Sequence, residues 1–474
     1  MCNPRIAFNL LFAVLVSFSL IQVFSYQNAE SGEINAFTTN ILLSTEDMIY
    51  PAHVEPTLAI STNGTLFAGW KQAYSHNGEG VRVSFSKSID GGITWSSPFD
   101  MPKFMGMNTG QSDPWLVWHN ESLFYAYLEY ELNRPPATAW SQITMARSQD
   151  YGKSWNPVTA TYGEGFADKE TIAISSSGVI YVAYDDIVGE KVAIRVSRSE
   201  DAGMTFSEVK VITDSVTNPV DHLSPYITTD SQENVYVAWI WYTEANWGDI
   251  YMVKSQDQGQ TFSAASDINL NDQNASITIT DGRVSRASLP VLRFHDERLF
   301  VSWCARLEEA GGWDVYLRYS DDYGATWSDR IRVNPDTEGD QWQPDFDIDN
   351  MGRVHYVWLD EQGNSFRPYY RMISISDLDS TPTLGPVVPI ASVRTSNAFT
   401  RPGDYFTVRV DGADIPHVVW TDGRNDGMDI YYSHGIHEET TTNTTPTSFH
   451  PYIPVVLLLT VVLKKIRGRF KSYE

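Results

Sequence analysis

The sequence predicts an all-β fold, a seven-bladed β-propeller of four-stranded antiparallel blades. Three observations support this prediction. A short turn motif occurs five times, a two-strand pattern occurs seven times, and the last repeat lacks a strand that the N-terminal segment can supply. Regular self-similarity is the mark of repeat architectures, and a chain of 474 residues is longer than one ordinary core needs.

The turn motif reads Ser-x-Asp-x-Gly-x-Thr/Ser-Trp/Phe, and we call it the Asp box. Its aspartate accepts hydrogen bonds from backbone N–H groups just ahead of it, its glycine takes a positive φ, and its aromatic ring fills the gap between neighbouring sheets. These are turn-forming roles, so we expect the box to be structural. The five box aspartates are Asp90, Asp150, Asp201, Asp257 and Asp322.

The two-strand pattern consists of an alternating strand, a turn and an aromatic-rich strand. Alternation with a period of two residues marks strands. A third strand leads into the box, as in Asp249–Ser255, and a fourth leaves it, as in Arg330–Val333. Four short antiparallel strands per repeat make a propeller blade. The seven copies of the pattern begin at Pro56, Pro114, Glu170, Pro225, Pro290, Pro344 and Tyr405.

The number of blades follows from the last two repeats. The sixth repeat has no box, since it reads Ser374 to Asp379 at that place, and the seventh stops at its third strand, Asp429–Ser433. Residues 40–45 have the pattern of a fourth strand. We therefore expect them to complete the seventh blade and to close the ring without a free edge. Six blades with one degenerate repeat is the alternative.

The N-terminus carries an export signal. Arg5 precedes an apolar run over residues 6–24 with small residues near its end, which predicts a signal peptide over residues 1–25. An uncleaved N-terminal anchor is the alternative. The propeller is then expected over residues 36–437.

The C-terminus carries a second membrane signal. Residues 438–448 are rich in threonine and predict a stalk. Residues 449–464 predict a transmembrane anchor, because the basic tail 465–474 follows at once and favours a C-terminus inside the cell. A buried or interfacial helix is the alternative. The protein is therefore expected on the extracellular face of the cell membrane, as a single-pass protein.

Composition excludes several classes of partner. The formal net charge of −25 repels phosphate backbones, so no nucleic-acid partner is expected. Cys2 lies in the predicted signal peptide, which leaves Cys304 unpaired and excludes a disulfide-held fold. The histidines of the repeats have no metal-ligand spacing, so no metal or cofactor is expected, although a structural Ca²⁺ site built from scattered acidic residues stays open.

Asp boxes within four-stranded repeats resemble the sialidase-type Asp-box propellers, also called BNR-repeat propellers, over residues 40–434. The resemblance is specific for the fold and less so for activity, because such boxes also occur in other glycosidases and in non-catalytic propellers. Sialidases themselves have six blades. The resemblance implies a catalytic set of three arginines on the substrate carboxylate, a Tyr–Glu nucleophile pair and an Asp acid/base.

This chain matches that set only in part. Val54 stands where the family places its first arginine, two residues before the proline that opens the first repeat. Glu79 is the sole carboxylate in the loop that carries the family's acid/base, and Asp113 begins an Asp-Pro pair like one in the family's site. Tyr405 is nearest to the nucleophile position, two residues out of register, and Arg286 has the spacing of the second arginine. The resemblance therefore implies Asp113, Glu79 and Tyr405 as catalytic candidates.

The functional face can also be located without the family. Asp boxes join strands three and four, so the loops before strand one and between strands two and three share the opposite face. Arginines, carboxylates and aromatic residues in these loops suit a sugar ring, which needs a stacking platform and polar edges. The alternative is that these charged residues pair with one another around the channel. The ligand-binding candidates are Arg286, Arg401, Arg424, Asp168, Asp221, Asp340 and Trp247, and the same loops carry Glu55, Lys169 and Asp404.

Three functions are compatible with these features. The first is binding of a glycan or another surface ligand at the channel mouth, without hydrolysis. The second is an exo-acting glycoside hydrolase of sialidase type with an altered catalytic set. The third is a structural or partner-binding surface protein. The sequence leaves open whether the protein is an enzyme.

Overall fold

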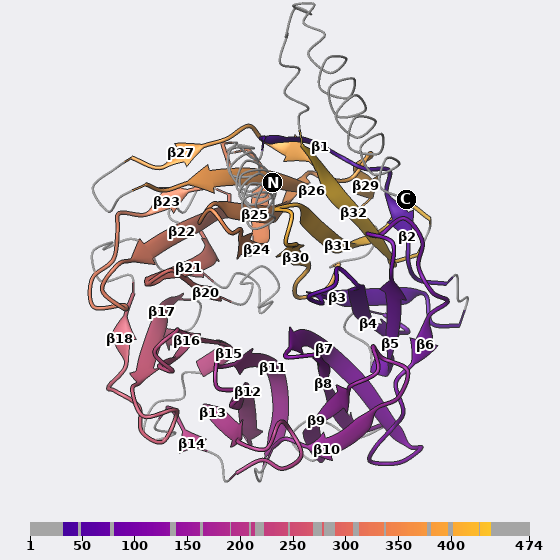
Figure 1. The fold of residues 1–474 in the computed structure, drawn as a ribbon, viewed down its shortest axis with the longest axis vertical. Coiled ribbons are helices and arrows are strands. Elements are labelled where there is room, and N and C mark those ends of the chain that lie inside the picture. Colours follow the sequence, from indigo (N-terminus) through magenta and orange to yellow (C-terminus); the bar gives the residue numbers. More distant parts are fainter. Residues whose placement is uncertain are drawn as a thin grey trace, which may run out of the picture. The chain divides into compact units, whose positions relative to one another are not determined.

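Seven antiparallel sheets stand in a ring, each sheet forming one blade of a propeller (Figure 1). This confirms the predicted fold class, and the six-bladed alternative is wrong. The computed structural model describes residues 32–45, 49–75, 80–132, 139–161, 165–189, 191–207, 210–213, 222–244, 247–268, 277–278, 290–306, 312–335, 338–376, 381–396, 402–425 and 427–437, all within one compact unit.

The predicted signal peptide, stalk, anchor and basic tail lie outside the described residues. Within the described part of the chain, no helix has the length and apolar character needed to cross a membrane. The predictions for the two ends of the chain therefore stay predictions.

In blades 1 to 6 the chain runs from the innermost strand outward. Blade 1 consists of β3 Ala52–Ile60, β4 Leu66–Ala73, β5 Gly80–Ser88 and β6 Phe99–Asp100. Blade 2 consists of β7 Thr109–His119, β8 Ser122–Glu131, β9 Ser141–Ser148 and β10 Asn156–Thr159. Blade 3 consists of β11 Phe166–Ile174, β12 Ile180–Val188, β13 Lys191–Ser199 and β14 Lys210–Val211. Blade 4 consists of β15 His222–Thr229, β16 Val235–Glu244, β17 Trp247–Ser255 and β18 Ser266–Asp267, and the short strand β19 Ile277–Thr278 also pairs with β17. Blade 5 consists of β20 Val291–His295, β21 Arg298–Ala305, β22 Asp314–Ser320 and β23 Ile331–Arg332.

In blades 6 and 7 the fourth-strand position is filled by two or three short strands that all pair with the third strand. Blade 6 is β24 Asp340–Ile348, β25 Val354–Gln362 and β26 Ser365–Ser374, with β27 Thr383–Leu384, β28 Val388–Pro389 and β29 Thr395–Ser396 all pairing with β26. Blade 7 is β30 Thr407–Val410, β31 Pro416–Asp422 and β32 Asp429–His437, with β1 Ile34–Phe37 and β2 Ile41–Leu42 on its outer side.

One aromatic residue per blade forms a repeating core. It occupies the same position of the second strand in all seven repeats, and all seven side chains are fully buried. Each ring removes a large apolar area from water because the second strand is covered by neighbouring blades on both faces. These residues are Trp70, Tyr127, Tyr184, Trp239, Trp303, Trp358 and Trp420.

The Asp boxes are closed turns between the third and fourth strands. In blade 4, Asp257 accepts hydrogen bonds from Ser255 Oγ at 2.8 Å and from the backbone N–H and hydroxyl of Thr261 at 2.8 and 2.5 Å. The Gly259 N–H donates to Ser255 Oγ at 2.8 Å, and Gly259 itself has a φ of +79°. The bonds from Thr261 and Ser255 lower the pKa of Asp257 to about 2. The other four boxes repeat the Ser–Asp and Thr/Ser–Asp contacts.

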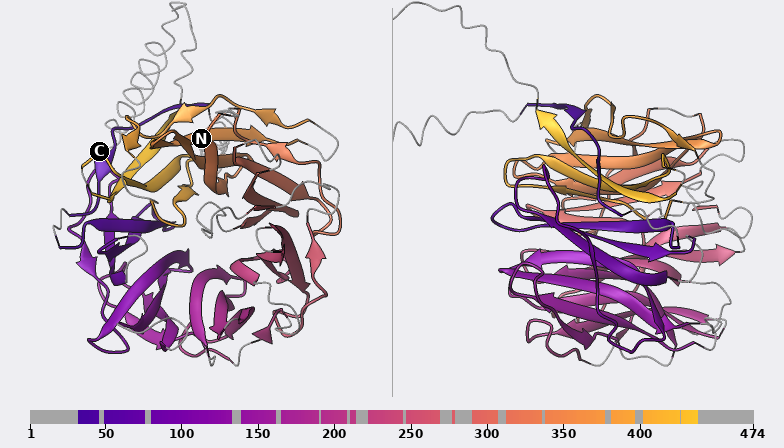
Figure 2. Two further views of the ribbon diagram at one scale, coloured as in Figure 1. Left: turned by 180° about the vertical axis from the view of Figure 1, so that it is seen from behind. Right: turned by 90° about the vertical axis from the view of Figure 1, so that its right-hand side faces the viewer.

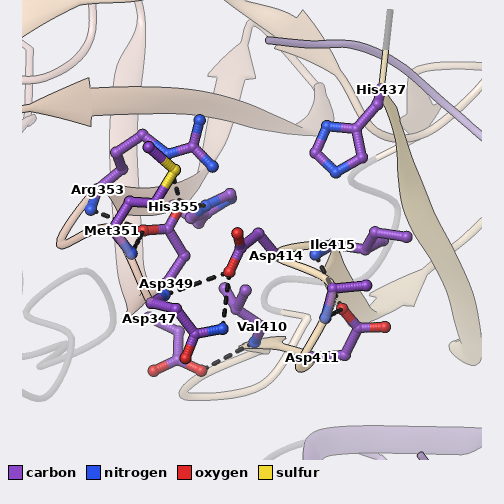
Figure 3. A network of polar contacts seen from close by, with 12 residues as sticks. Asp347, Asp349, Met351, Arg353, His355, Val410, Asp411, Asp414, Ile415 and His437 are labelled. Atoms are coloured by element: carbon purple, nitrogen blue, oxygen red, sulfur yellow. Dashed lines mark hydrogen bonds and ion pairs between the residues drawn. The ribbon is translucent and has the colours of Figure 1, made fainter. Parts of the chain in front are cut away.

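A second set of turns, between the first and second strands, lies on the same face as the boxes. Figure 3 shows two of them. Asp349 accepts hydrogen bonds from two backbone N–H groups of its own turn at 2.9 Å each and lies 3.0 Å from His355 Nε2. Asp411 accepts two equivalent backbone bonds at 2.9 Å and contacts His417. We call this face of the ring the box face and the opposite face the loop face.

The N-terminal segment closes the ring, as predicted. Ile41 pairs with Tyr432 and Leu42 with Tyr431, and the backbone N–H of Leu43 donates to the Ile430 carbonyl at 2.8 Å. The strand β1 pairs with the far end of β32. Figures 1 and 2 show the indigo N-terminal strands beside the yellow β32. Blade 7 is thus built from the two ends of the propeller.

We predict that Leu43→Ala destabilises the protein by about 2–4 kcal/mol, because a buried leucine leaves a cavity when truncated. Leu43 is 4% exposed and packs with side chains of blades 1 and 7. The matched control is Leu42→Ala, since Leu42 is 38% exposed and its truncation should cost less than about 1 kcal/mol. Chemical denaturation measures both. Equal losses would show that the closing segment does not contribute through its packing.

We predict that Asp257→Asn lowers the melting temperature at pH 7 and that this difference shrinks in acid. The folded pKa of Asp257 is about 2, against about 3.9 for an unfolded aspartate, so the carboxylate stabilises the fold above about pH 4. That contribution is lost as the pH falls through about 2. The exposed Asp329, which lies outside the box, is the control as Asp329→Asn. Thermal melts from pH 7 to pH 2 measure both, and a mutant-to-wild-type difference that does not change with pH would contradict the prediction.

Candidate functional site

Five of the seven innermost strands carry a β-bulge near their start, on the loop face. The pairing register shifts at the same position in β3, β7, β11, β15 and β24. One residue in each bulge has a positive φ: Glu55 at 57°, Asp113 at 51°, Lys169 at 56°, Ser224 at 60° and Gln343 at 50°. Non-glycine residues rarely adopt this conformation, and bulges redirect side chains. The bulges place chemically active side chains at the loop-face end of the channel.

Three buried carboxylates meet at that end. One oxygen each from Glu55, Asp113 and Asp404 lies within 4.8 Å of the others. The Asp113 N–H donates to Glu55 Oε2 at 3.3 Å. Gly403, just before Asp404, approaches so closely that a Cβ there would lie 2.9 Å from the Glu55 nitrogen. We call Glu55, Asp113, Asp404, Lys169 and Lys71 the mouth cluster.

Two lysines balance these carboxylates. Lys169 Nζ lies 3.4 Å from Asp113 Oδ1 and is hydrogen-bonded to Asp404, and Lys71 Nζ lies 3.5 Å from Glu55 Oε1. Burial alone would lower the pKa of Lys169, but the charges of Asp113 and other carboxylates outweigh it and raise the pKa. The three carboxylates have the oxygen donors that a calcium ion prefers. The ammonium of Lys169 already supplies a positive charge between two of them.

Three further acidic residues lie beside the mouth cluster, and the pKa of each carboxyl group is raised. Burial and the charge of Asp113 raise the pKa of Asp168 to about 6. Burial also raises the pKa of Glu170 and of Asp185 well above the usual range. Asp185 accepts hydrogen bonds from the Ser224 N–H at 3.1 Å. Glu170 is 3% exposed, and neither carboxyl oxygen has a hydrogen-bond partner among the described residues. The buried surroundings of these three acids therefore favour their protonated forms.

Aromatic rings close the channel below the mouth cluster. The ring centroid of Trp115 lies 5.6 Å from that of Tyr226 and 5.6 Å from that of Tyr405, both edge-on. A void of about 10 Å³ remains among them, which is about the space that one water molecule needs. The Tyr405 hydroxyl donates to the Pro114 carbonyl at 3.0 Å, and burial raises the pKa of this phenol. We call Trp115, Tyr226 and Tyr405 the aromatic floor.

The structure brings three of the predicted site residues together, since Asp113 and Asp168 lie in the mouth and Tyr405 in its floor. Two others lie elsewhere. Arg424 pairs with Asp422 at 2.6 Å and holds Asn40 of the closing segment, and Asp340 Oδ1 accepts the Trp313 N–H at 3.1 Å. The side chain of Trp247 and the whole of Glu79, Asp221, Arg286 and Arg401 lie outside the described parts of the chain.

Sequence reasoning missed Lys71, Glu170 and Asp185 as site residues. Lys71 and Asp185 lie on second strands, where a charged residue interrupts an otherwise apolar and buried run. A buried charge in such a run needs a partner, and this signal could have found both residues. Glu170 occupies the position at which several other repeats begin with proline.

Val54 replaces the arginine that the sialidase resemblance implies. Its side chain is 0% exposed and packs with Ala52, Ala73 and Met428 in a small apolar cluster. An arginine at this position would have to leave that cluster to reach a ligand. Position 54 therefore provides no positive charge to the mouth.

Comparisons with known proteins agree with the fold. Residues 64–289, which run from blade 1 through blade 4, match the BNR repeat-like domain family. A protein of unknown function from Dyadobacter fermentans DSM 18053 has a TM-score of 0.51 and 17% identity, over 73% of this chain and 100% of that one. An ulvan lyase of polysaccharide lyase family 25, solved with a bound -[GlcA(1-4)Rha3S]- unit, has a TM-score of 0.50 and 13% identity, over 84% and 94%.

A leech intramolecular trans-sialidase has a TM-score of 0.45 and 12% identity, over 83% of this chain and 70% of that one. No curated protein matches the sequence. At 17% and 13% identity, the Dyadobacter protein and the ulvan lyase show a shared fold and no more. The matched domain, the repeated Asp boxes and the ring of seven four-stranded blades place the chain in the sialidase-type superfamily of BNR-repeat β-propellers.

Proposed function

We propose that the protein binds a carbohydrate at the loop-face mouth of its channel. The mouth cluster carries this proposal, because Glu55, Asp113 and Lys169 are held in strained backbone conformations that aim them at one point. Such strain persists only where the surrounding structure fixes it, and it gathers at functional sites. Carboxylates and ammonium groups are suitable partners for sugar hydroxyls. The fold shared with a polysaccharide lyase supports a carbohydrate ligand.

The charges in the mouth favour an uncharged sugar. Glu55, Asp113 and Asp404 face two lysines, and Asp168 adds a further negative charge above about pH 6. Among the described residues the mouth is thus net acidic. An acidic site repels a sialic acid carboxylate, and the arginine that would bind that carboxylate is replaced by Val54.

A second candidate function, glycoside hydrolysis, is favoured by Glu170. Its carboxyl group is buried and lacks a described hydrogen-bond partner, and burial and the charge of Asp113 raise its pKa well above the usual range, which favours the protonated form. Such an acid can give its proton to a glycosidic oxygen as the bond to the anomeric carbon breaks. A water molecule then adds to that carbon and transfers a proton to the Asp113 carboxylate. The two acids would thereby divide the roles of proton donor and base.

We propose that this binding takes place at the outer face of a membrane, because the sequence predicts a signal peptide and an anchor over residues 449–464.

We predict that intact cells expressing the full chain bind a fluorescent neutral oligosaccharide, and that the detergent-purified full chain binds it too. Asp113→Asn should weaken binding at least about tenfold, or 1.4 kcal/mol, because the charge that orders Lys169 is lost. Asp257→Asn is the control, since it alters a turn on the opposite face.

The outcomes separate the claims. Binding by purified protein but not by intact cells would contradict the location and leave the function standing. Equal binding by wild type and Asp113→Asn, with both folded in thermal melts, would place the ligand outside the mouth cluster. Preference for sialylated over neutral glycans on an array would contradict the proposed ligand class.

We predict that the purified chain releases no sialic acid from a fluorogenic sialoside. If the mouth hydrolyses a neutral glycoside, a panel of fluorogenic substrates should reveal it. Glu170→Gln should then lower the rate by about 10² to 10⁴, the usual contribution of a general acid. Turnover that survives Glu170→Gln unchanged would exclude Glu170 as the proton donor. Release of sialic acid by the wild-type protein would contradict the inference that the replacement of an arginine by Val54 prevents sialoside turnover.

A further inference from the structure

The box-face end of the channel holds a separate cavity of about 380 Å³. All seven innermost strands contribute to its walls, and it lies beyond the aromatic floor from the mouth cluster. No residue of the mouth cluster lines it. Its volume lies within the range of small-molecule sites.

The walls of this cavity are divided into two halves. Blades 1 to 3 contribute apolar and small side chains, including Ile60, Val117 and Ile174. Val117 faces the channel, because it lies two residues after Trp115 of the aromatic floor and side chains alternate along a strand. Blades 5 to 7 contribute the charged side chains Arg293, Asp347 and Arg409. An apolar wall therefore faces a charged wall across the cavity.

Each guanidinium nitrogen of the first arginine in the charged wall, Arg293, has a neighbour in the fold, and its Nε lies 3.9 Å from Asp347 Oδ1. Arg293 Nη2 lies 3.3 Å from Asp345 Oδ1, and Arg293 Nη1 donates to the Tyr226 hydroxyl and to the Leu292 carbonyl. Its guanidinium also stacks over the Tyr226 ring, 5.2 Å from the centroid. Asp347 accepts the Val410 N–H at 2.9 Å (Figure 3). These contacts fix the positions of both side chains.

The second arginine is engaged on one nitrogen. Arg409 Nη1 donates to Asp345 Oδ2 at 3.1 Å and to the Val408 carbonyl at 2.6 Å. Its Nε and Nη2 atoms contact no acceptor in the described part of the chain. Burial and the nearby charge of Arg409 lower the pKa of Arg293 to about 10. Both arginines contact the same carboxylate, that of Asp345. The Nε–Nη2 edge of a guanidinium matches the two oxygens of a carboxylate.

We propose that this cavity binds a small organic monocarboxylate with an apolar body. The carboxylate pairs with the Nε–Nη2 edge of Arg409, and the body lies against the apolar wall around Val117. A dianionic phosphate fits less well for two reasons. Asp347 adds a negative charge to the same wall, and the single open guanidinium edge of Arg409 balances one negative charge rather than two. The inference is independent of the proposed carbohydrate function, since it concerns the other end of the channel.

Titration calorimetry of the full chain with sodium benzoate tests the proposal, with benzamide as the uncharged probe of the same shape. Benzoate should bind and benzamide should bind at least about tenfold more weakly. Arg409→Lys keeps a positive charge beside Asp345 but lacks the bidentate edge, so it should weaken benzoate binding about tenfold or more. Val117→Phe fills the cavity without changing its charge and should also remove binding. Asp113→Asn, at the mouth, should leave it unchanged.

Three results would overturn the proposal. The first is no benzoate binding to the folded wild-type chain up to about 10 mM, the range of very weak affinity. The second is equal binding by wild type, Arg409→Lys and Val117→Phe, which would place benzoate elsewhere. The third is equal affinity for benzoate, acetate and sulfate, which would show an unselective anion effect. Thermal melts of each variant confirm that the protein is folded.

Discussion

Ring closure is the constraint on which the rest of this structure depends. The seventh repeat has three strands, and the pairing of Ile41 and Leu42 with β32 completes it from the other end of the chain. Buried Leu43 then joins the packing of blades 1 and 7. Because each blade is held by its two neighbours, an open ring would leave two blade faces exposed. Closure also fixes the innermost strands around one axis, so residues more than 300 positions apart, such as Glu55 and Asp404, can meet.

The channel formed by closure has two ends with different chemistry. At the loop face, bulges in five of the seven innermost strands each hold one residue in a strained conformation, and carboxylates and lysines gather there. At the box face, the strands are regular, and their alternating side chains give an apolar wall opposite Arg293 and Arg409. The aromatic floor of Trp115, Tyr226 and Tyr405 separates the ends. A single scaffold thus offers two binding environments, one shaped by bulges and one by strand alternation.

Stability and function are assigned to different parts of each repeat. The Asp boxes recur in five blades with the same contacts, and a buried aromatic residue recurs in all seven, which is expected for residues that build the fold. The mouth residues differ from blade to blade, as Glu55, Asp113, Lys169, Ser224 and Gln343 occupy equivalent bulges. Gln343 acts indirectly, because its side chain donates to the Gly403 carbonyl beside Asp404. Variation at equivalent positions is what a ring needs to make an asymmetric site from symmetric parts.

The sequence by itself determined the repeat, the number of blades and the closing strand, because turn chemistry and strand alternation are local and each repeat carries both. It also located the loop face and named Asp113 and Asp168, which follow from their place just before an innermost strand. The tertiary structure decided which charges meet. Arg424 was expected at the mouth and instead pairs with Asp422, whereas Lys71 and Asp185 enter the mouth from second strands. Bulge geometry and ring closure set these distances. Asp345 is shared between Arg293 of blade 5 and Arg409 of blade 7, which leaves Nε and Nη2 of Arg409 without an acceptor among the described residues.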